Sequence, residues 1–258
     1  MVTYDRLQHP VLEVSIGGSV VTKRPSAFEL ITDQGIPSVM ARLSYPVQTA
    51  VGSKGDKIVI SLSLGGSRSI LFTGIIYDVK VRGAYRELAL TDGYKKLWDT
   101  VVTPAYRKEL ASVILNDILD AAGVESSAIT CPPVVLARFS SASLPASSCL
   151  FLLIKALEEH GYSGLRFFFD AKNVFRFGTL NDTGINEGAA VVLETGKNII
   201  RKGPGWVEVL PMAVRHSQAI TVDGVRVIPV RTALSVSRQS SRLMLWIKED
   251  TRWTPDPN

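Results

Sequence analysis

The chain has 258 residues, of which 46% are hydrophobic and 21% are charged, and its formal net charge is +5. This balance is typical of a globular protein with one large domain or two to three small ones. Lysine and arginine are dispersed without a basic run, so we read the positive charge as a solvated surface and not as a nucleic-acid-binding stretch.

Residues 11 to 91 have the pattern of continuous β structure. The segment "VLEVSIGG" alternates up to a Gly17–Gly18 turn, and "GDKIVISLSLGG" alternates up to a Gly65–Gly66 turn. The segment "SILFTGIIYDVKVRGAYRELALTD" predicts a long strand pair with its turn at residues 82–85. Its alternation breaks at Ile75–Ile76, which predicts a bulge or a strand buried on both faces.

The middle of the chain predicts two helices. In "TPAYRKELASVILNDILDAAGV", Thr103 can cap a helix, Pro104 fits its first position and Gly123 can end it. Its expected apolar stripe consists of Leu110, Val113, Ile114, Ile118 and Ala121.

The second helix is predicted in "SCLFLLIKALEEHGY", with Ser147 or Ser148 as its cap and Gly161 at its end. Its expected buried stripe consists of Leu150, Leu153, Ile154 and Leu157. The segment "LRFFFDAKNVFRFG" then predicts a hairpin with residues 170–173 as the loop.

From Ala189 the pattern returns to strands, and one part echoes the first β region. The segment "LSVSRQSSRLML" (234–245) has the same alternation and turn length as "VKVRGAYRELAL" (79–90). Val225 and Val227 fall at the offset of Ile70 and Phe72. We interpret the echo as two related β modules, although alternation alone could produce this match.

No set of residues has the pattern of a catalytic or metal site, so we predict no enzyme, no metal and no cofactor. His9 lies in a loop, His160 at a predicted helix end, and His216 beside Ser217 without a third catalytic member. The remaining candidates are isolated or unsuited to a site: the carboxylates Glu158, Glu159, Asp78, Asp92 and Asp99, and the thiols Cys131 and Cys149. The thiols lack zinc-site spacing and are expected to be reduced.

Three segments bear on nucleic-acid or phosphate binding. "GKNIIRKGPG" is basic but is better explained as a hairpin tip, and "GTLNDTGINEG" lacks the residues of a phosphate loop. The aromatic hairpin "RFFFDAKNVFRFG" is better explained as core than as an RNA-stacking surface.

The opening "MVTYDRLQHP" predicts no signal peptide, and no apolar run approaches the ~20 residues that span a bilayer.

The ordered set of segments resembles the baseplate hub proteins of contractile bacteriophage tails and related injection machines, including the late control protein D group. "VLEVSIGG" is similar to the opening strand of that family, and "GDKIVISLSLGGSRSILFTGIIYDVKV" to its central hairpin. "YRKELASVILNDILDAAGV", "LFLLIKALEEHGYSGLRFFFDAKNVFRFG" and "MAVRHSQAITVDG" resemble the elements that follow. Many relatives are longer, which leaves any further domain and the mode of spike attachment open.

The resemblance implies a mainly β fold in which two similar β-barrel modules, at residues 1–94 and 186–258, flank an α+β module at 95–185. It implies a structural virion protein: a homotrimeric baseplate hub that joins a sixfold tail tube to a threefold central spike and lets the genome pass. The expected partners are further copies of the chain, the tail tube protein, the spike, other baseplate proteins and DNA in transit, without stable membrane association.

Such a protein would be assembled in the host bacterial cytoplasm and reside in the virion tail. We expect its channel face not to be strongly basic, because DNA must pass. The alternative from another class is a nucleic-acid or glycan binding β-barrel module, favoured by the basic balance and the aromatic hairpin. A tail-associated cell-wall hydrolase ranks last, because no acid pair or zinc set stands out.

Overall fold

The computed structural model describes residues 10–64, 67–125, 127–179, 191–237 and 239–247. Its chain forms two compact units, one from residues 1–91 with 189–258 and the other from residues 92–188. We call them the first and second unit. His9, the opening segment and most of "GTLNDTGINEG" lie outside the described residues.

Most strands of the first unit form one eleven-stranded sheet in the order β16-β17-β21-β20-β3-β4-β7-β6-β5-β1-β2. The paired strands are antiparallel throughout. Its strands are β1 (Val11–Ile16), β2 (Ser19–Val20), β3 (Ala27–Asp33), β4 (Ile36–Pro46), β5 (Lys57–Leu64), β6 (Ser67–Arg82), β7 (Tyr85–Thr91), β16 (Ile199–Gly203), β17 (Trp206–Val209), β20 (Pro229–Ser237) and β21 (Ser241–Ile247). A second sheet contains β15 (Val191–Leu193), β18 (Ile220–Val222) and β19 (Val225–Val227).

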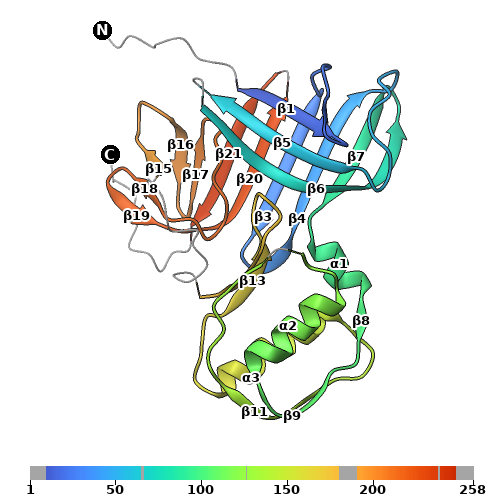
Figure 1. Ribbon diagram of the computed structural model, residues 1–258. Coiled ribbons are helices and arrows are strands. Elements are labelled where there is room, and N and C mark those ends of the chain that lie inside the picture. The colour runs from blue at the N-terminus through green and yellow to red at the C-terminus, as the bar shows by residue number, and fades with distance from the viewer. Residues whose placement is uncertain (1–9, 65–66, 126, 180–190, 238, 248–258) are drawn as a thin grey trace. The chain divides into compact units, whose positions relative to one another are not determined.

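The two β regions of the sequence meet where β3 pairs with β20. Leu30 lies opposite Leu234 and Phe28 opposite Val236, all four of them buried. Figure 1 shows the blue β3 beside the red β20, although about 200 residues separate them. The mainly β fold with an inserted helical region is confirmed, whereas the division into separate barrels at residues 94 and 186 stays a prediction.

The sequence echo is reproduced in strand pairing, but only in part. Val79 lies opposite Leu88 in the β6–β7 pair, and Leu234 lies opposite Leu243 in the β20–β21 pair. The predicted match of Ile70 and Phe72 to Val225 and Val227 fails, because Ile70 and Phe72 continue along β6 while β19 belongs to the other sheet.

The break at Ile75–Ile76 coincides with an irregularity in β6. The register with β7 shifts between Ile76 and Asp78, so Tyr77 is an extra residue opposite Ala89. A bulge is therefore present, one residue beyond the predicted position. The register with β5 shifts as well, between Ile60 and Ser61.

Tyr45 lies fully buried in the core of the first unit, and its hydroxyl has no hydrogen-bond partner within the described residues. Burial raises the pKa of Tyr45 from 10.0 to about 12. Tyr45 is therefore neutral in the folded protein at a pH at which the unfolded chain already ionises.

We expect Tyr45→Phe to stabilise the protein by ~1 kcal/mol near pH 7, because it removes a buried hydroxyl without a partner. Between pH 10 and pH 12 the wild type should lose a further ~2–3 kcal/mol that the variant keeps, since the folded pKa is the higher one. Urea titrations across this pH range measure both effects. Tyr85→Phe is the control, because Tyr85 is 51% exposed; equal alkaline loss in wild type and Tyr45→Phe would contradict the prediction.

The second unit packs its helices and short strands around a separate apolar core. Its sheets are a three-stranded sheet in the order β10-β14-β13 and two strand pairs, β11 with β9 and β12 with β8. Its elements are α1 (Tyr94–Asp99), β8 (Val101–Val102), β9 (Ala105–Leu110), α2 (Ala111–Ala121), β10 (Ser127–Ile129), β11 (Val135–Ser140), β12 (Leu144–Pro145), α3 (Ala146–Glu159), β13 (Arg166–Phe169) and β14 (Phe175–Gly178).

The predicted start of the first helix is wrong. Residues 105–110 form β9, which pairs with β11, and α2 begins only at Ala111 with Leu110 as its N-cap. Thr103 does not cap this helix, and its hydroxyl accepts the backbone N–H of Ser143 instead. The cross-strand partner, invisible in the local pattern, overrides the helical signal.

The later start also shifts the buried face of α2. Its buried residues are Ala111, Ile114, Leu115, Ile118 and Leu119, whereas the predicted stripe members Leu110, Val113 and Ala121 are exposed. Gly123 follows the helix end with a φ of 64°, as its predicted role requires.

The other predictions for this unit are largely confirmed. Helix α3 buries Leu150, Leu153, Ile154 and Leu157, but its N-cap is Pro145 and not Ser147 or Ser148. The hairpin β13–β14 forms as predicted, and its phenylalanines are buried, with Phe167, Phe169, Phe175 and Phe177 in the core. The aromatic hairpin is therefore core material and not an exposed stacking surface.

Candidate assembly surface

One face of the large sheet points away from the apolar core and carries an unusual set of side chains. Strand alternation buries Val207, Leu245 and Thr232, so their neighbours Trp206, Trp246 and Arg231 point to the other side. In the adjacent row Met244, Ala233, Ile31 and Met40 lie opposite one another across β21, β20, β3 and β4. We call Ile31, Ile36, Met40, Arg201, Trp206, Arg231, Met244 and Trp246 the tryptophan–arginine face.

Arginine side chains cover both tryptophans of this face. The guanidinium of Arg231 lies 5.2 Å from the ring centroid of Trp246, and that of Arg201 lies 5.8 Å from the ring of Trp206. Arg231 also approaches Asp33 at 3.9 Å. Such cation–π contacts hold the aromatic rings in fixed positions and keep charge beside apolar surface.

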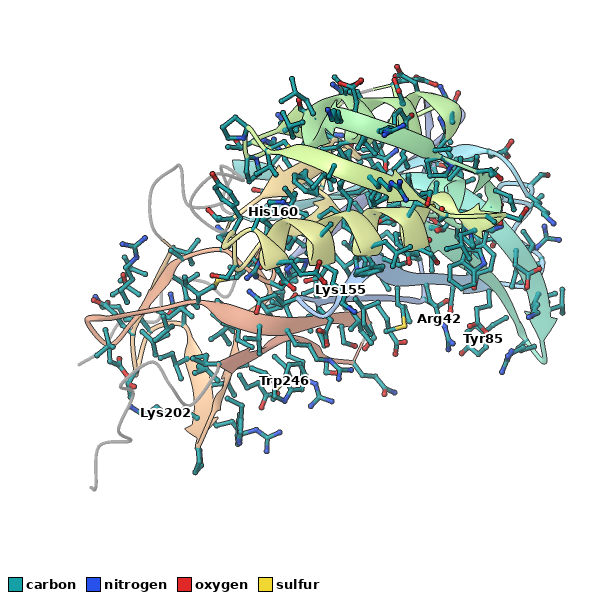
Figure 2. All side chains as sticks on the ribbon, turned by 90° about the horizontal axis from the view of Figure 1, so that it is seen from below. Arg42, Tyr85, Lys155, His160, Lys202 and Trp246 are labelled. Atoms are coloured by element: carbon teal, nitrogen blue, oxygen red, sulfur yellow. The ribbon has the colours of Figure 1, made fainter. Side chains whose placement is uncertain are left out.

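Glu208 lies at the centre of this arrangement. Its side chain is only 5% exposed and pairs with Arg201 and with Arg242, which approaches at 3.5 Å. A buried carboxylate held by exposed arginines fixes the direction in which those arginines can bond a neighbour. Figure 2, which views the side chains from below, labels Trp246 on β21 and Arg42 on β4.

Apolar side chains are exposed on the same face. Met40 is 49% and Ile36 is 47% exposed. Tryptophan, methionine and arginine are the residue types enriched in protein–protein interfaces and among their energetically dominant residues. The arrangement therefore fits protein association better than chemistry on a small molecule.

The sequence analysis did not single out this face. Its signal was the alternation of "GWVEVL" and "RLMLWI", in which tryptophan, methionine and arginine occupy positions that a solvated sheet would fill with small polar residues. The partner strands β3 and β4, which complete the face, lie too far away in sequence for the pattern to connect them.

The histidine positions examined for catalysis have structural surroundings. His160 is the C-cap of α3, and its Nδ1 lies 2.8 Å from the carbonyl oxygen of Ala156. His216 is buried, with Nδ1 3.0 Å from the hydroxyl of Ser217, and Ser217 also accepts Gln34 Nε2. The Ser–His pair is therefore part of a buried network.

The carboxylates and cations of the candidate segments are dispersed or paired locally. Asp78 pairs with Lys80, Asp99 with Lys95, and the basic hairpin residue Lys202 with Asp223. Glu158 and Glu159 are exposed at the end of α3. Cys131 and Cys149 are free thiols, and no cluster of three metal-ligating side chains occurs within the described ranges.

None of the helices in the described part of the chain has the length and apolarity needed to cross a membrane.

Comparison with known proteins identifies solved structures that have a similar fold. No family model and no curated protein sequence matches the chain. A tail protein from Neisseria meningitidis matches with a TM-score of 0.68 at 14% identity, over 96% of this chain and 99% of that one. The 43 kDa tail protein of prophage MuSo2 from Shewanella oneidensis matches with a TM-score of 0.67 at 9% identity, over 93% of this chain and 98% of that one.

A third similar structure comes from a secretion machine. It is a type VI secretion system component of E. coli, with a TM-score of 0.64 at 14% identity, over 94% of this chain and 79% of that one. That protein is described as similar to the T4 tail proteins gp27 and gp5. The chain therefore has the fold found in phage tail proteins and in a type VI secretion component.

Proposed function

We propose that the protein is a structural tail component that assembles as a homotrimeric baseplate hub between a tail tube and a central spike. The observation that carries the proposal is that nearly the whole chain matches nearly the whole of two solved tail-protein chains. The tryptophan–arginine face and the open sheet edges supply the association surfaces that such a ring needs. The proposal makes the virion tail the site of action and gives the protein no enzymatic role.

In the proposed ring, each subunit contributes its two β regions around the axis, so three subunits present six similar elements to a sixfold tube. The register shared by Val79–Leu88 and Leu234–Leu243 supports this pseudo-repetition. The partners would be further copies of the chain, the tube and spike proteins and other baseplate proteins, with DNA passing through.

The direct test is the mass of the purified protein by light scattering, alone and with the tail tube and spike proteins from the same gene neighbourhood. A trimer, or a ring with the partners present, supports the proposal. A chain that stays monomeric with both partners present overturns it. Salt-dependent binding of single-stranded nucleic acid by the isolated protein would instead favour the binding-module alternative.

We propose further that the tryptophan–arginine face forms a subunit contact of the trimer. Met40→Asp should then weaken assembly about tenfold or more, because an unpaired carboxylate in a desolvated contact costs at least ~1.4 kcal/mol. Val135→Asp in the second unit is the matched control, since Val135 is 55% exposed and Met40 is 49% exposed. Equal assembly of both variants at micromolar concentration would show that this face is not the contact.

A further inference from the structure

Strand β6 has an open edge over its last six residues. Strand β5 pairs with β6 only as far as Ile75, and Ile76 is bonded to the loop at Gly55 and Asp56. From Tyr77 to Arg82, β6 pairs with β7 on one side, and no strand of the described residues pairs with its other side. We call residues 77–82 the β6 edge.

The backbone of Val79 faces this open side. Its N–H donates to Asp78 Oδ1 at 3.0 Å, and Asp78 Oδ2 accepts from Lys80 Nζ at 2.9 Å. Asp78 thus occupies a backbone donor that a further strand would otherwise use. Lys80 hydrogen bonding and charge keep the pKa of Asp78 below its ordinary value, so the carboxylate is ionised at neutral pH.

The sequence of the edge, Tyr-Asp-Val-Lys-Val-Arg, is complementary to itself in one antiparallel register. With Val79 opposite Val79, Asp78 of each copy lies opposite Lys80 of the other, which makes two opposite-charge pairs around a two-fold axis. A shift of two residues in one direction places Lys80 opposite Lys80, with Asp78 opposite Arg82 on either side, and in the other direction Asp78 opposite Asp78. Each shifted register therefore brings one pair of like charges together. Of these three registers, the one centred on Val79 pairs opposite charges without placing like charges opposite each other.

We propose that the β6 edge binds the β6 edge of a second copy of this chain in this register. On pairing, the two Val79 residues exchange N–H···O=C bonds, and each Asp78 carboxylate turns from its own Val79 N–H to the partner's Lys80. The bulge at Tyr77 and the exposed charges keep the contact short. The contact is accordingly weak, and it forms at high local protein concentration.

This contact is independent of the proposed trimer. A three-fold ring needs two unlike surfaces on each subunit, whereas the β6 edge matches itself and joins copies, or whole rings, in pairs. Its signature is therefore even stoichiometry: dimers from monomers, or hexamers from trimers.

The test is sedimentation equilibrium of the full chain over a wide concentration range, with the variants Asp78→Lys and Lys80→Asp. Each variant places like charges opposite each other twice and should weaken the paired species about tenfold or more. An equimolar mixture of the two variants should restore pairing between unlike copies, because the two lysines on the edge of one variant then face the two aspartates on the edge of the other.

The mixture distinguishes a lost contact from a folding defect. Both variants lose the same Asp78–Lys80 ion pair within the chain, and mixing them would restore pairing between copies but would not repair a folding defect. Circular dichroism of each variant checks the fold independently. Absence of any even-numbered species in the wild type, or pairing that persists unchanged in both single variants, overturns the proposal. Loss of trimer without loss of pairing, as expected for Met40→Asp, would support a contact separate from the trimer.

Discussion

Gly74→Ala should destabilise the first unit by ~3 kcal/mol or more, because the centre of the sheet has no room for a methyl group at this position. A Cβ on Gly74 would lie 2.2 Å from the carbonyl oxygen of Thr91 and 2.6 Å from the ring of Phe72. The ring can turn, but the carbonyl belongs to β7, whose Thr91 is paired with Ile75. The backbones of β6 and β7 would have to separate locally.

Urea unfolding followed by tryptophan fluorescence measures this effect. Gly35→Ala is the matched control, because a Cβ there would lie 3.5 Å from Asp33 Oδ1, an ordinary contact distance, and should change the unfolding free energy by less than ~0.5 kcal/mol. If Gly74→Ala has the same urea midpoint of unfolding as the wild type, then β7 does not lie as close to Gly74 as the structure shows.

Whether a sequence prediction was confirmed depends on how far away in the sequence the pairing partner of that segment lies. The strand in "VLEVSIGG" and the hairpin in "LRFFFDAKNVFRFG" could be predicted from the sequence. Each has a clear alternation of apolar residues, and each has a pairing partner close by in the chain. The start of α2 was not predictable, since residues 105–110 become a strand only through β11, about 30 residues later. Thr103 as a cap and Pro104 at the first helical position are locally consistent with a helix, but the pairing of β9 with β11 prevents that helix from starting there.

The candidate surface was harder to predict than the fold. Alternation indicates which side chains share a face of one strand, but not which strands lie side by side. The tryptophan–arginine face depends on the pairing of β20 with β3, which unites segments about 200 residues apart. Glu208 shows the same limit: its side chain is only 5% exposed because Arg201 and Arg242 enclose it, and the sequence of its own strand gives no sign of these partners.

A buried polar network secures the junction between β3 and β20. Thr32 Oγ1 lies 2.8 Å from Thr232 Oγ1, and Thr32 also accepts the backbone N–H of His216 at 3.1 Å. Both threonines are nearly inaccessible, at 1% and 2% exposure, so neither hydroxyl has water as a ready alternative. The network joins β3 to β20 and to the segment at His216, both of which lie more than 180 residues later in the sequence.

Thr32→Val should therefore destabilise the protein by ~2 kcal/mol, because valine keeps the shape but removes the acceptor of one buried donor and the partner of another. Thr232→Val should cost less, ~1 kcal/mol, since Thr32 then still accepts from His216. The double variant should lose less than the sum of the two, because it removes both members of the threonine pair. Unfolding free energies of the three variants form a double-mutant cycle, and Thr32→Ser, which keeps the hydroxyl, is the control. Equal losses for Thr32→Val and Thr232→Val, with strict additivity in the double variant, would show that the hydroxyls do not couple the two strands.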